Sequence, residues 1–235
     1  MKTSAPQLDF PEEEVGVQLE SLTLRIPAGG VTLLGDLEIP AHAIGLVLFA
    51  HESGSSRRSV RNQAVAEFSR ASGIATLLFD LLTPEEEMED AHTGYLRFDI
   101  ALLSRRLITV TQEMADDSRL QTLGLGYFGA STGGAAALLA AAAFGSNIQA
   151  VVSRGGRPDL AGDALPHVKS ATLLIVGERD EEVLRLNEKA YARLRCEKSL
   201  AIVPRATHLF EEAGALEEAA RLAVNWFRKH LKPRQ

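Results

Sequence analysis

The chain has 235 residues, and its 46% hydrophobic and 24% charged residues are typical of a globular protein with a substantial core. The formal net charge of −6 argues against a general surface for nucleic acid or for an anionic membrane. No apolar stretch follows the lysine of the first residues, MKTSAPQLDFPEEE, and no apolar run approaches membrane-spanning length, so we expect a cytoplasmic protein. The single cysteine, Cys196, excludes an internal disulfide.

Strand and helix patterns alternate along the chain without a polar linker, which predicts one domain over residues 1–235, with residues 1–16 as a loosely ordered segment. The first two strands, 17–26 and 31–39, flank Pro27-Ala28-Gly29-Gly30 and predict an antiparallel hairpin. Later strands are expected at residues 45–50, 75–79, 123–128, 148–153, 172–177 and 200–204. Helices are expected at residues 57–72, 95–115, 135–143, 181–195 and 215–231. This alternation implies a parallel sheet with helices on both faces.

The acidic run 84–90 (PEEEMED) lies between the strand at 75–79 and the helix at 95–115. Like charges at this density repel one another. We therefore expect a solvated, mobile loop in this part of the chain.

The pentapeptide Gly129-Ala130-Ser131-Thr132-Gly133 separates a predicted strand from an alanine-rich helix. A G-x-S-x-G pattern in this context is typical of a nucleophile elbow, in which the serine occupies a strained turn. Glycines at both ends avoid collisions with the neighbouring strand and helix. We expect Ser131 to be a nucleophile and the backbone N–H of Thr132 to face any oxyanion formed there.

Two further residues complete a triad in the order serine, acid, histidine. Asp180 lies just beyond the strand at 172–177, and His208 lies beyond the strand at 200–204. Because parallel strands end at the same edge of a sheet, these side chains are expected to meet Ser131 there. The alternative is that Asp180 caps a helix and His208 is an ordinary loop histidine, which leaves the strained serine turn unexplained.

These three residues on this strand order resemble the α/β-hydrolase superfamily. The phrases GASTGG, VSRGGRPDL, LLIVGERD and ATHLFEE are similar to the dienelactone hydrolase-like group, some of whose members are fused to phosphoribosyltransferase domains. The resemblance covers nearly the whole chain beyond about residue 20. It implies an α/β-hydrolase fold: a mostly parallel eight-stranded sheet, helices on both faces and no large cap. It also implies a serine hydrolase that cleaves carboxylic esters, thioesters or lactones through an acyl-enzyme.

The segment 51–54 (HESG) is where this superfamily usually supplies a second oxyanion donor, here the backbone N–H of Ser53. Many relatives have His-Gly at this point, so Glu52 is a departure, although dienelactone hydrolases carry a glutamate in the corresponding loop. A carboxylate beside a developing oxyanion is unfavourable unless it is neutralised or turned away. Glu52 either contributes to the substrate site or pairs with one of the nearby arginines, Arg57, Arg58 or Arg61.

Arg154 and Arg157 follow the strand at 148–153, which is expected to end at the active-site edge. They can clamp an anionic group of a substrate, or they can form local salt bridges with Asp159 or Asp163. The short segment 154–171 leaves no room for the sizeable cap that lipid-cleaving relatives carry, so we expect a shallow pocket for small acyl substrates, with anionic ones favoured.

Two weaker motifs do not predict a cofactor or a metal. Gly124-x-Gly126-x-x-Gly129 matches a dinucleotide fingerprint, but its first glycines fall inside a strand and no acidic residue follows at the required distance. His51-Glu52 lacks the second histidine of a zinc motif.

We expect a monomer or a homodimer. Acyl transfer by the same triad, or a catalytically weak binding protein with this fold, are the alternative functions.

Overall fold

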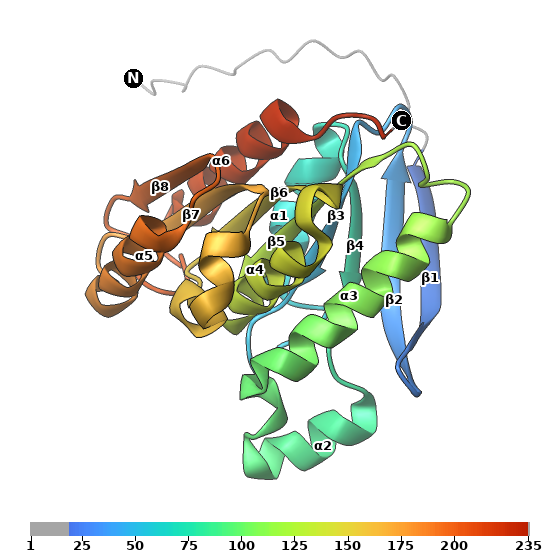
Figure 1. The fold of residues 1–235 in the computed structure, drawn as a ribbon, viewed down its shortest axis with the longest axis horizontal. Coiled ribbons are helices and arrows are strands. Elements are labelled where there is room, and N and C mark those ends of the chain that lie inside the picture. The colour runs from blue at the N-terminus through green and yellow to red at the C-terminus, as the bar shows by residue number, and fades with distance from the viewer. Residues whose placement is uncertain (1–18, 235) are drawn as a thin grey trace, which may run out of the picture.

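The computed structural model describes residues 19–234, so the loosely ordered segment expected at residues 1–16 lies outside the described part. The strands are β1 (Leu19–Ala28), β2 (Val31–Pro40), β3 (Gly45–Ala50), β4 (Ala75–Phe79), β5 (Gly124–Ala130), β6 (Ile148–Arg154), β7 (Ala171–Gly177) and β8 (Lys198–Val203). They form one eight-stranded sheet in the order β1-β2-β4-β3-β5-β6-β7-β8 (Figure 1). β1 and β2 are antiparallel to their neighbours, and all pairs from β4 to β8 are parallel. The expected fold class is confirmed.

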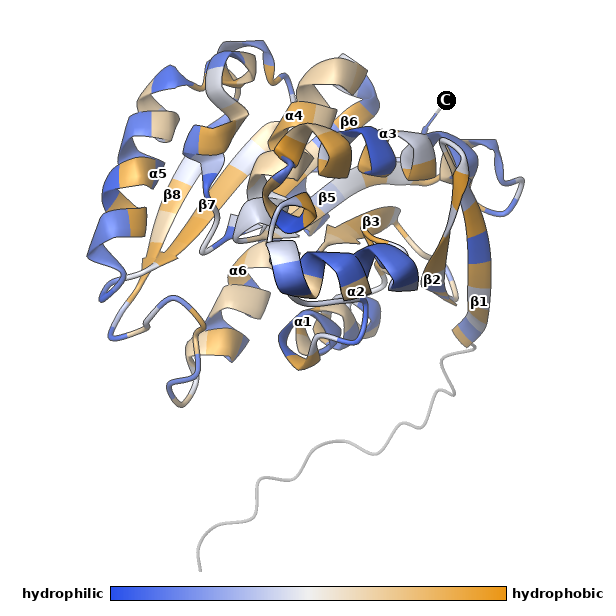
Figure 2. Ribbon diagram, turned by 90° about the horizontal axis from the view of Figure 1, so that it is seen from below, coloured by the Kyte–Doolittle hydropathy of each residue, from blue (hydrophilic) through white to orange (hydrophobic). Residues whose placement is uncertain are grey.

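The helices are α1 (Val60–Ala71), α2 (Pro84–Thr93), α3 (Ile100–Asp116), α4 (Thr132–Phe144), α5 (Glu181–Arg193) and α6 (Ala215–His230). Short 3-10 helices lie at η1 (Leu96–Phe98), η2 (Gly145–Asn147) and η3 (Pro158–His167). α3, α4 and α5 cover one face of the sheet, and α1 and α6 cover the other (Figure 2). In residues 19–234 we find no helix with the length and apolar character needed to span a bilayer.

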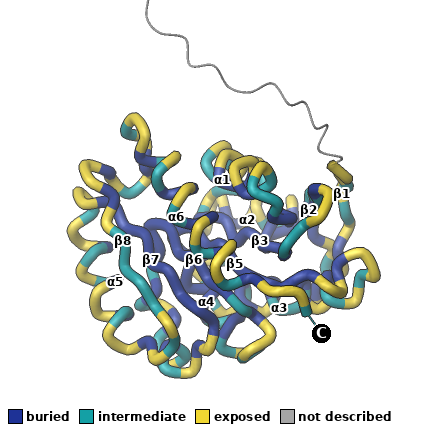
Figure 3. Tube along the Cα trace, turned by 90° about the horizontal axis from the view of Figure 1, so that it is seen from above, coloured by how far each residue is buried: buried dark blue, intermediate teal, exposed yellow. Residues whose placement is uncertain are grey.

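The central strands are mostly apolar, as expected for strands from which helices exclude water on both faces of the sheet. Every residue of β3, β4, β5 and β7 is buried, and Figure 3 shows β5 and β7 in the dark centre of the molecule. The predicted hairpin is confirmed at the edge of the sheet. Gly29 and Gly30 form its two-residue turn with φ of 63° and 96°, the left-handed values that such a turn requires.

The chain reverses its direction across the sheet at β3. β4 lies on one side of β3 and β5 on the other, so the loops that leave β3 and β5 diverge at their carboxyl ends. In open α/β sheets this switch point leaves a crevice where ligands bind. The loop after β3 begins at His51, and the loop after β5 contains Ser131.

The mobile loop expected at residues 84–90 is wrong, because the segment is helix α2. Thr83 Oγ1 accepts a hydrogen bond from the Glu86 N–H at 3.2 Å, and the Glu86 carboxylate accepts one from the Thr83 N–H at 2.8 Å. Pro84 is the first helical residue and Gly94 ends the helix with φ of 65°. The capping box satisfies free N–H groups, and the acidic first turn lies at the positive end of the helix dipole.

Candidate active site

Ser131 lies between β5 and α4 in a strained turn, with φ of 50° and ψ of −119°. A Cβ atom at Gly133 would lie 2.1 Å from the carbonyl oxygen of Ala50, and one at Gly129 would lie 2.5 Å from the carbonyl oxygen of Gly133. Both positions therefore require glycine, for the steric reason that the pentapeptide suggested. The Ser131 N–H donates to the Arg154 carbonyl at 3.2 Å, which fixes the turn against β6.

Asp180 and His208 meet at the same edge of the sheet. His208 Nδ1 lies 2.6 Å from Asp180 Oδ2, although the two residues are 28 positions apart. Asp180 occupies the position before α5, yet its side chain makes no capping hydrogen bond. The carboxylate is thus committed to the imidazole, and the helix-cap alternative does not apply.

The hydroxyl of Ser131 makes no hydrogen bond to His208 or to any other group among residues 19–234. Such contacts are often long in an enzyme without substrate and shorten when substrate binds. Gly155 keeps the space beside the histidine open, because a Cβ there would lie 3.1 Å from the His208 carbonyl oxygen.

Ser53 and Thr132, the two expected oxyanion donors, face each other across the crevice. Their hydroxyl oxygens are 2.9 Å apart. Thr132 is the first residue of α4, where an N–H has no partner within the helix. The backbone N–H groups of Ser53 and Thr132 donate no hydrogen bond to any other group among residues 19–234.

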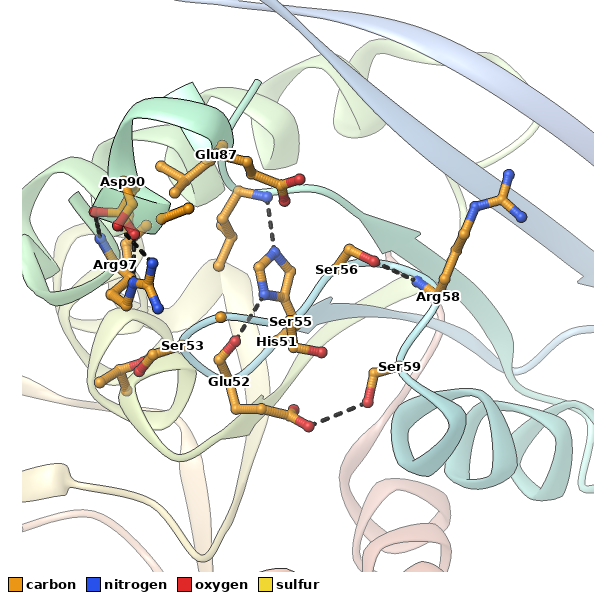
Figure 4. A pocket seen from close by; sticks show the side chains of 16 residues that line it. His51, Glu52, Ser53, Ser55, Ser56, Arg58, Ser59, Glu87, Asp90 and Arg97 are labelled. Atoms are coloured by element: carbon orange, nitrogen blue, oxygen red, sulfur yellow. Dashed lines mark hydrogen bonds and ion pairs between the residues drawn. The ribbon is translucent and has the colours of Figure 1, made fainter. Parts of the chain in front are cut away.

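Glu52 is buried and turned toward α1, away from this pair (Figure 4). Its carboxylate accepts hydrogen bonds from Ser59 Oγ at 3.1 Å, Arg61 at 2.9 Å and Asn62 Nδ2 at 3.2 Å, and Arg154 lies 3.8 Å away. Burial acts to raise the pKa of Glu52, but its own N–H, the charge of Arg154 and the bond from Arg61 hold that pKa below its ordinary value. Among the arginines considered, Arg61 is the partner of Glu52.

Arg154, the last residue of β6, and Arg157, just after it, are both engaged within the protein. Arg154 is 4% exposed, reaches Glu52 and places its guanidinium 5.6 Å from the centre of the Phe210 ring. Burial lowers the pKa of Arg154 to about 10. Arg157 forms a two-bonded fork with Asp159 at 2.9 and 2.8 Å, the salt bridge considered as an alternative.

A cavity of about 520 Å³ opens beside the Ser53–Thr132 pair (Figure 4). One wall is the loop after β3, and the opposite wall comes from α2 and η1. Its lining includes Ser53 and Thr132 but neither Ser131 nor His208, so it adjoins the expected oxyanion site and not the nucleophile itself.

Two residues of this region were not identified from the sequence. His51 is buried, its Nδ1 donates to the Glu52 carbonyl at 3.0 Å, and its Nε2 accepts the Leu81 N–H at 3.0 Å (Figure 4). Burial lowers the pKa of His51 and favours the neutral ring that these two bonds require. Arg97 pairs with the buried Asp90 and also lines the cavity, where its Nη1 would lie 3.2 Å from a Cβ at Gly54. No local sequence motif predicts the hydrogen bonds of His51 or the place of Arg97 in the cavity wall.

Comparisons with known proteins agree with this fold. The crystal structure of a dienelactone hydrolase from Anabaena variabilis matches with 55% sequence identity and a TM-score of 0.90, covering 92% of this chain and all of that one. A dienelactone hydrolase-like promiscuous phosphotriesterase from metagenomic libraries matches with 17% identity and a TM-score of 0.75, covering 92% of this chain and 100% of that one, and shows the fold alone.

A longer protein of Mycobacterium tuberculosis, provisionally named a phosphoribosyl transferase, is 55% identical over 208 residues. The match covers 88% of this chain and 46% of that protein, so the chain spans about half the length of the curated relatives it matches. No family model matches the chain. With 55% identity to a dienelactone hydrolase over 92% of its length, the chain belongs to the dienelactone hydrolase family.

Proposed function

We propose that the protein is a serine hydrolase that cleaves small carboxylic esters, thioesters or lactones through an acyl-enzyme at Ser131. The observation that carries the proposal is the Asp180–His208 contact of 2.6 Å, formed at the sheet edge from which the strained Ser131 turn projects. A carboxylate bonded to Nδ1 orients an imidazole and stabilises its charged form. This arrangement supports a histidine that accepts a proton from the serine.

In the proposed mechanism, Ser131 Oγ attacks the substrate carbonyl carbon while His208 Nε2 takes the serine proton. Backbone N–H groups of Ser53 and Thr132 stabilise the negative oxygen of the tetrahedral intermediate. The bond to the leaving group then breaks, and His208 returns its proton to the departing oxygen or sulfur. Water attacks the acyl-enzyme in the same way, with His208 as the base, and releases the acid and free Ser131.

The size of the cavity and the absence of a long segment between β6 and β7 favour short acyl substrates. Only η3 occupies that connection, and the cavity of about 520 Å³ suits a small ligand. An anionic substrate remains part of the proposal. Arg97 is its better-placed partner because, although it pairs with Asp90, it lines the cavity, whereas neither Arg154 nor Arg157 does.

The phosphoribosyl transferase name belongs to proteins about twice as long as the matched region. We assign the hydrolytic activity to the half that this chain represents, because its fold and its serine turn belong to that half. The activity in the name is assigned to the part of those relatives that lies outside the match.

Labelling with a fluorophosphonate probe tests the proposal. We expect covalent modification of Ser131, located by peptide mass spectrometry, and loss of labelling in Ser131→Ala. Ser118→Ala, at an exposed serine on the opposite edge of the sheet, is the matched control and should label normally. An unlabelled wild-type protein would favour the non-catalytic binding alternative, and acyl products formed with added alcohols in place of free acid would favour acyl transfer.

A further inference from the structure

The two residues that flank the proposed oxyanion site both carry a hydroxyl, and the two hydroxyls are bonded to each other. Ser53 belongs to the loop after β3, and Thr132 begins α4 after β5. The 2.9 Å bond between Ser53 Oγ and Thr132 Oγ1 therefore bridges the switch point of the sheet. No other hydrogen bond to either hydroxyl is formed by the described residues.

The bond between the hydroxyls leaves one hydrogen available. Each hydroxyl can donate once, and a single bond between the two oxygens uses one of the two hydrogens. Thr132 is 3% exposed, whereas Ser53 is only partly buried and lies at the cavity wall. When Thr132 donates to Ser53, the free hydrogen belongs to the more accessible hydroxyl.

We propose that the Ser53 hydroxyl is a third donor to the substrate carbonyl oxygen as negative charge develops on it, and that Thr132 Oγ1 holds this hydroxyl in place. The inference rests on the proposed function and adds a side-chain donor to the two backbone N–H groups. A chain of bonds from Thr132 through Ser53 to the oxyanion polarises each member in turn. Ser53 is then a catalytic residue through its side chain, and Thr132 Oγ1 is a positioning group.

The surroundings of Ser53 keep its hydroxyl oriented before substrate arrives. The Glu52 carbonyl accepts bonds from His51 Nδ1 at 3.0 Å and from the Ser55 N–H at 3.2 Å, which close the turn around Ser53. The Glu52 carboxylate does not compete for the hydrogen, because it is bonded to Ser59 and Asn62. Preorganised donors of this kind stabilise an oxyanion without reorganisation cost.

The test is a kinetic comparison of Ser53→Ala with Ser118→Ala on p-nitrophenyl acetate. Loss of one oxyanion donor lowers kcat by roughly 100-fold. Because the bond strengthens only in the transition state, we expect the loss in kcat with KM changed less than about twofold. Ser118→Ala should match the wild type, and the melting temperature of Ser53→Ala should stay near that of the wild type.

Variants at Thr132 separate positioning from bulk. Thr132→Val keeps the shape but removes the hydroxyl, and we expect kcat to fall roughly 10-fold, whereas Thr132→Ser should restore it. The double variant Ser53→Ala/Thr132→Val should be no slower than Ser53→Ala alone, because groups that act as a unit are not additive.

The outcomes distinguish this inference from the function on which it rests. If the wild type hydrolyses the ester and labels at Ser131, but Ser53→Ala behaves like Ser118→Ala or changes only KM, the hydroxyl inference alone is overturned. If the wild type neither hydrolyses nor labels, the proposed function and the inference both fail. The inference is supported if kcat falls in Ser53→Ala and in Thr132→Val but not in Thr132→Ser.

Discussion

The two sides of the crevice are built by different means. On the β5–β8 side, Ser131, Asp180 and His208 lie on the loops just beyond the ends of β5, β7 and β8, and the sheet itself carries them to one edge. On the β3–β4 side, the loop after β3 and helix α2 depend on side-chain contacts between residues distant in sequence, such as the bond from the Leu81 N–H to His51 Nε2. Strand ends therefore place the proposed reacting groups, whereas a network of polar side chains shapes the cavity beside them.

The largest effect is expected on the β5–β8 side. Asp180→Asn should lower kcat about 10⁴-fold, because the histidine loses the partner that sets its tautomer. Steady-state ester hydrolysis measures this. Asp163→Asn, at an exposed aspartate bonded to Arg193, is the control and should leave kcat unchanged. A loss below about tenfold in Asp180→Asn would mean that the strand ends do not position a triad.

Gly133→Ala should disrupt the junction between the two sides. Its Cβ would lie 2.1 Å from the Ala50 backbone carbonyl, which cannot move without shifting β3. Overpacking of this kind should cost about 3 kcal/mol or more of unfolding free energy, measured by denaturant titration. Gly134→Ala meets chiefly the Ser153 hydroxyl, at 2.5 Å, a side chain that can rotate, and should cost less. Equal costs would contradict the steric account.

Arg97→Met should weaken substrate binding on the β3–β4 side. We expect KM for a carboxylate-bearing ester to rise about 10-fold, corresponding to about 1.4 kcal/mol, with little change for a neutral ester of equal size. Arg97→Lys should restore part of the loss. The control Arg157→Met removes an arginine that is likewise paired with an aspartate but does not line the cavity, and it should leave both KM values unchanged. If Arg157→Met raised KM for the carboxylate-bearing ester and Arg97→Met did not, the anion would instead bind at the segment after β6.

Acidification should lower the unfolding free energy of the protein through His51, the first residue of the loop after β3. Burial lowers the pKa of His51, so the unfolded chain binds a proton more readily than the folded protein. Stability from this group is present above the ordinary histidine pKa of about 6.5 and declines as the pH falls toward the folded value, by about 1.4 kcal/mol per unit of depression. Unfolding free energies of the wild type and His51→Gln, measured from pH 7.5 to 5, should converge. Parallel curves would show that His51 does not contribute.

The smallest effect is expected at the cap of α2. Thr83→Ala removes one half of the capping box and should cost about 1 kcal/mol. Hydrogen exchange should quicken in residues 84–93 and not in α4. Thr109→Ala, whose hydroxyl bonds the carbonyl one turn back within α3, is the control and should not alter exchange in α2.

Much of the fold could be predicted because its signals are local. β3 and β4 have the predicted bounds, since each is a buried apolar run with abrupt ends. The helix expected at residues 57–72 starts later, at Val60, because Ser59 accepts the Asn62 N–H and caps it. The density of like charges in residues 84–90 favours a loop, but the capping box of Thr83-Pro84-Glu85-Glu86 stabilises α2 in spite of this repulsion.

The candidate site likewise has one part that sequence signals predict and another part that they do not. The Asp180–His208 contact was expected from motif and strand order, whereas the roles of His51 and Arg97 follow from partners that no spacing reveals. Whether Ser131, Asp180 and His208 act together in catalysis stays a prediction.

The way α2 is attached bears on how this protein can change. Only one of its side chains, Asp90, is buried, and ionic contacts such as Glu86–Arg106 hold the helix to α3. The helix therefore lies on the surface of the fold and contributes little to its hydrophobic core. We expect exchange of residues 84–93 for another capped segment to alter which acyl groups the protein accepts while its sheet still folds, so that new specificities can arise without rebuilding the core.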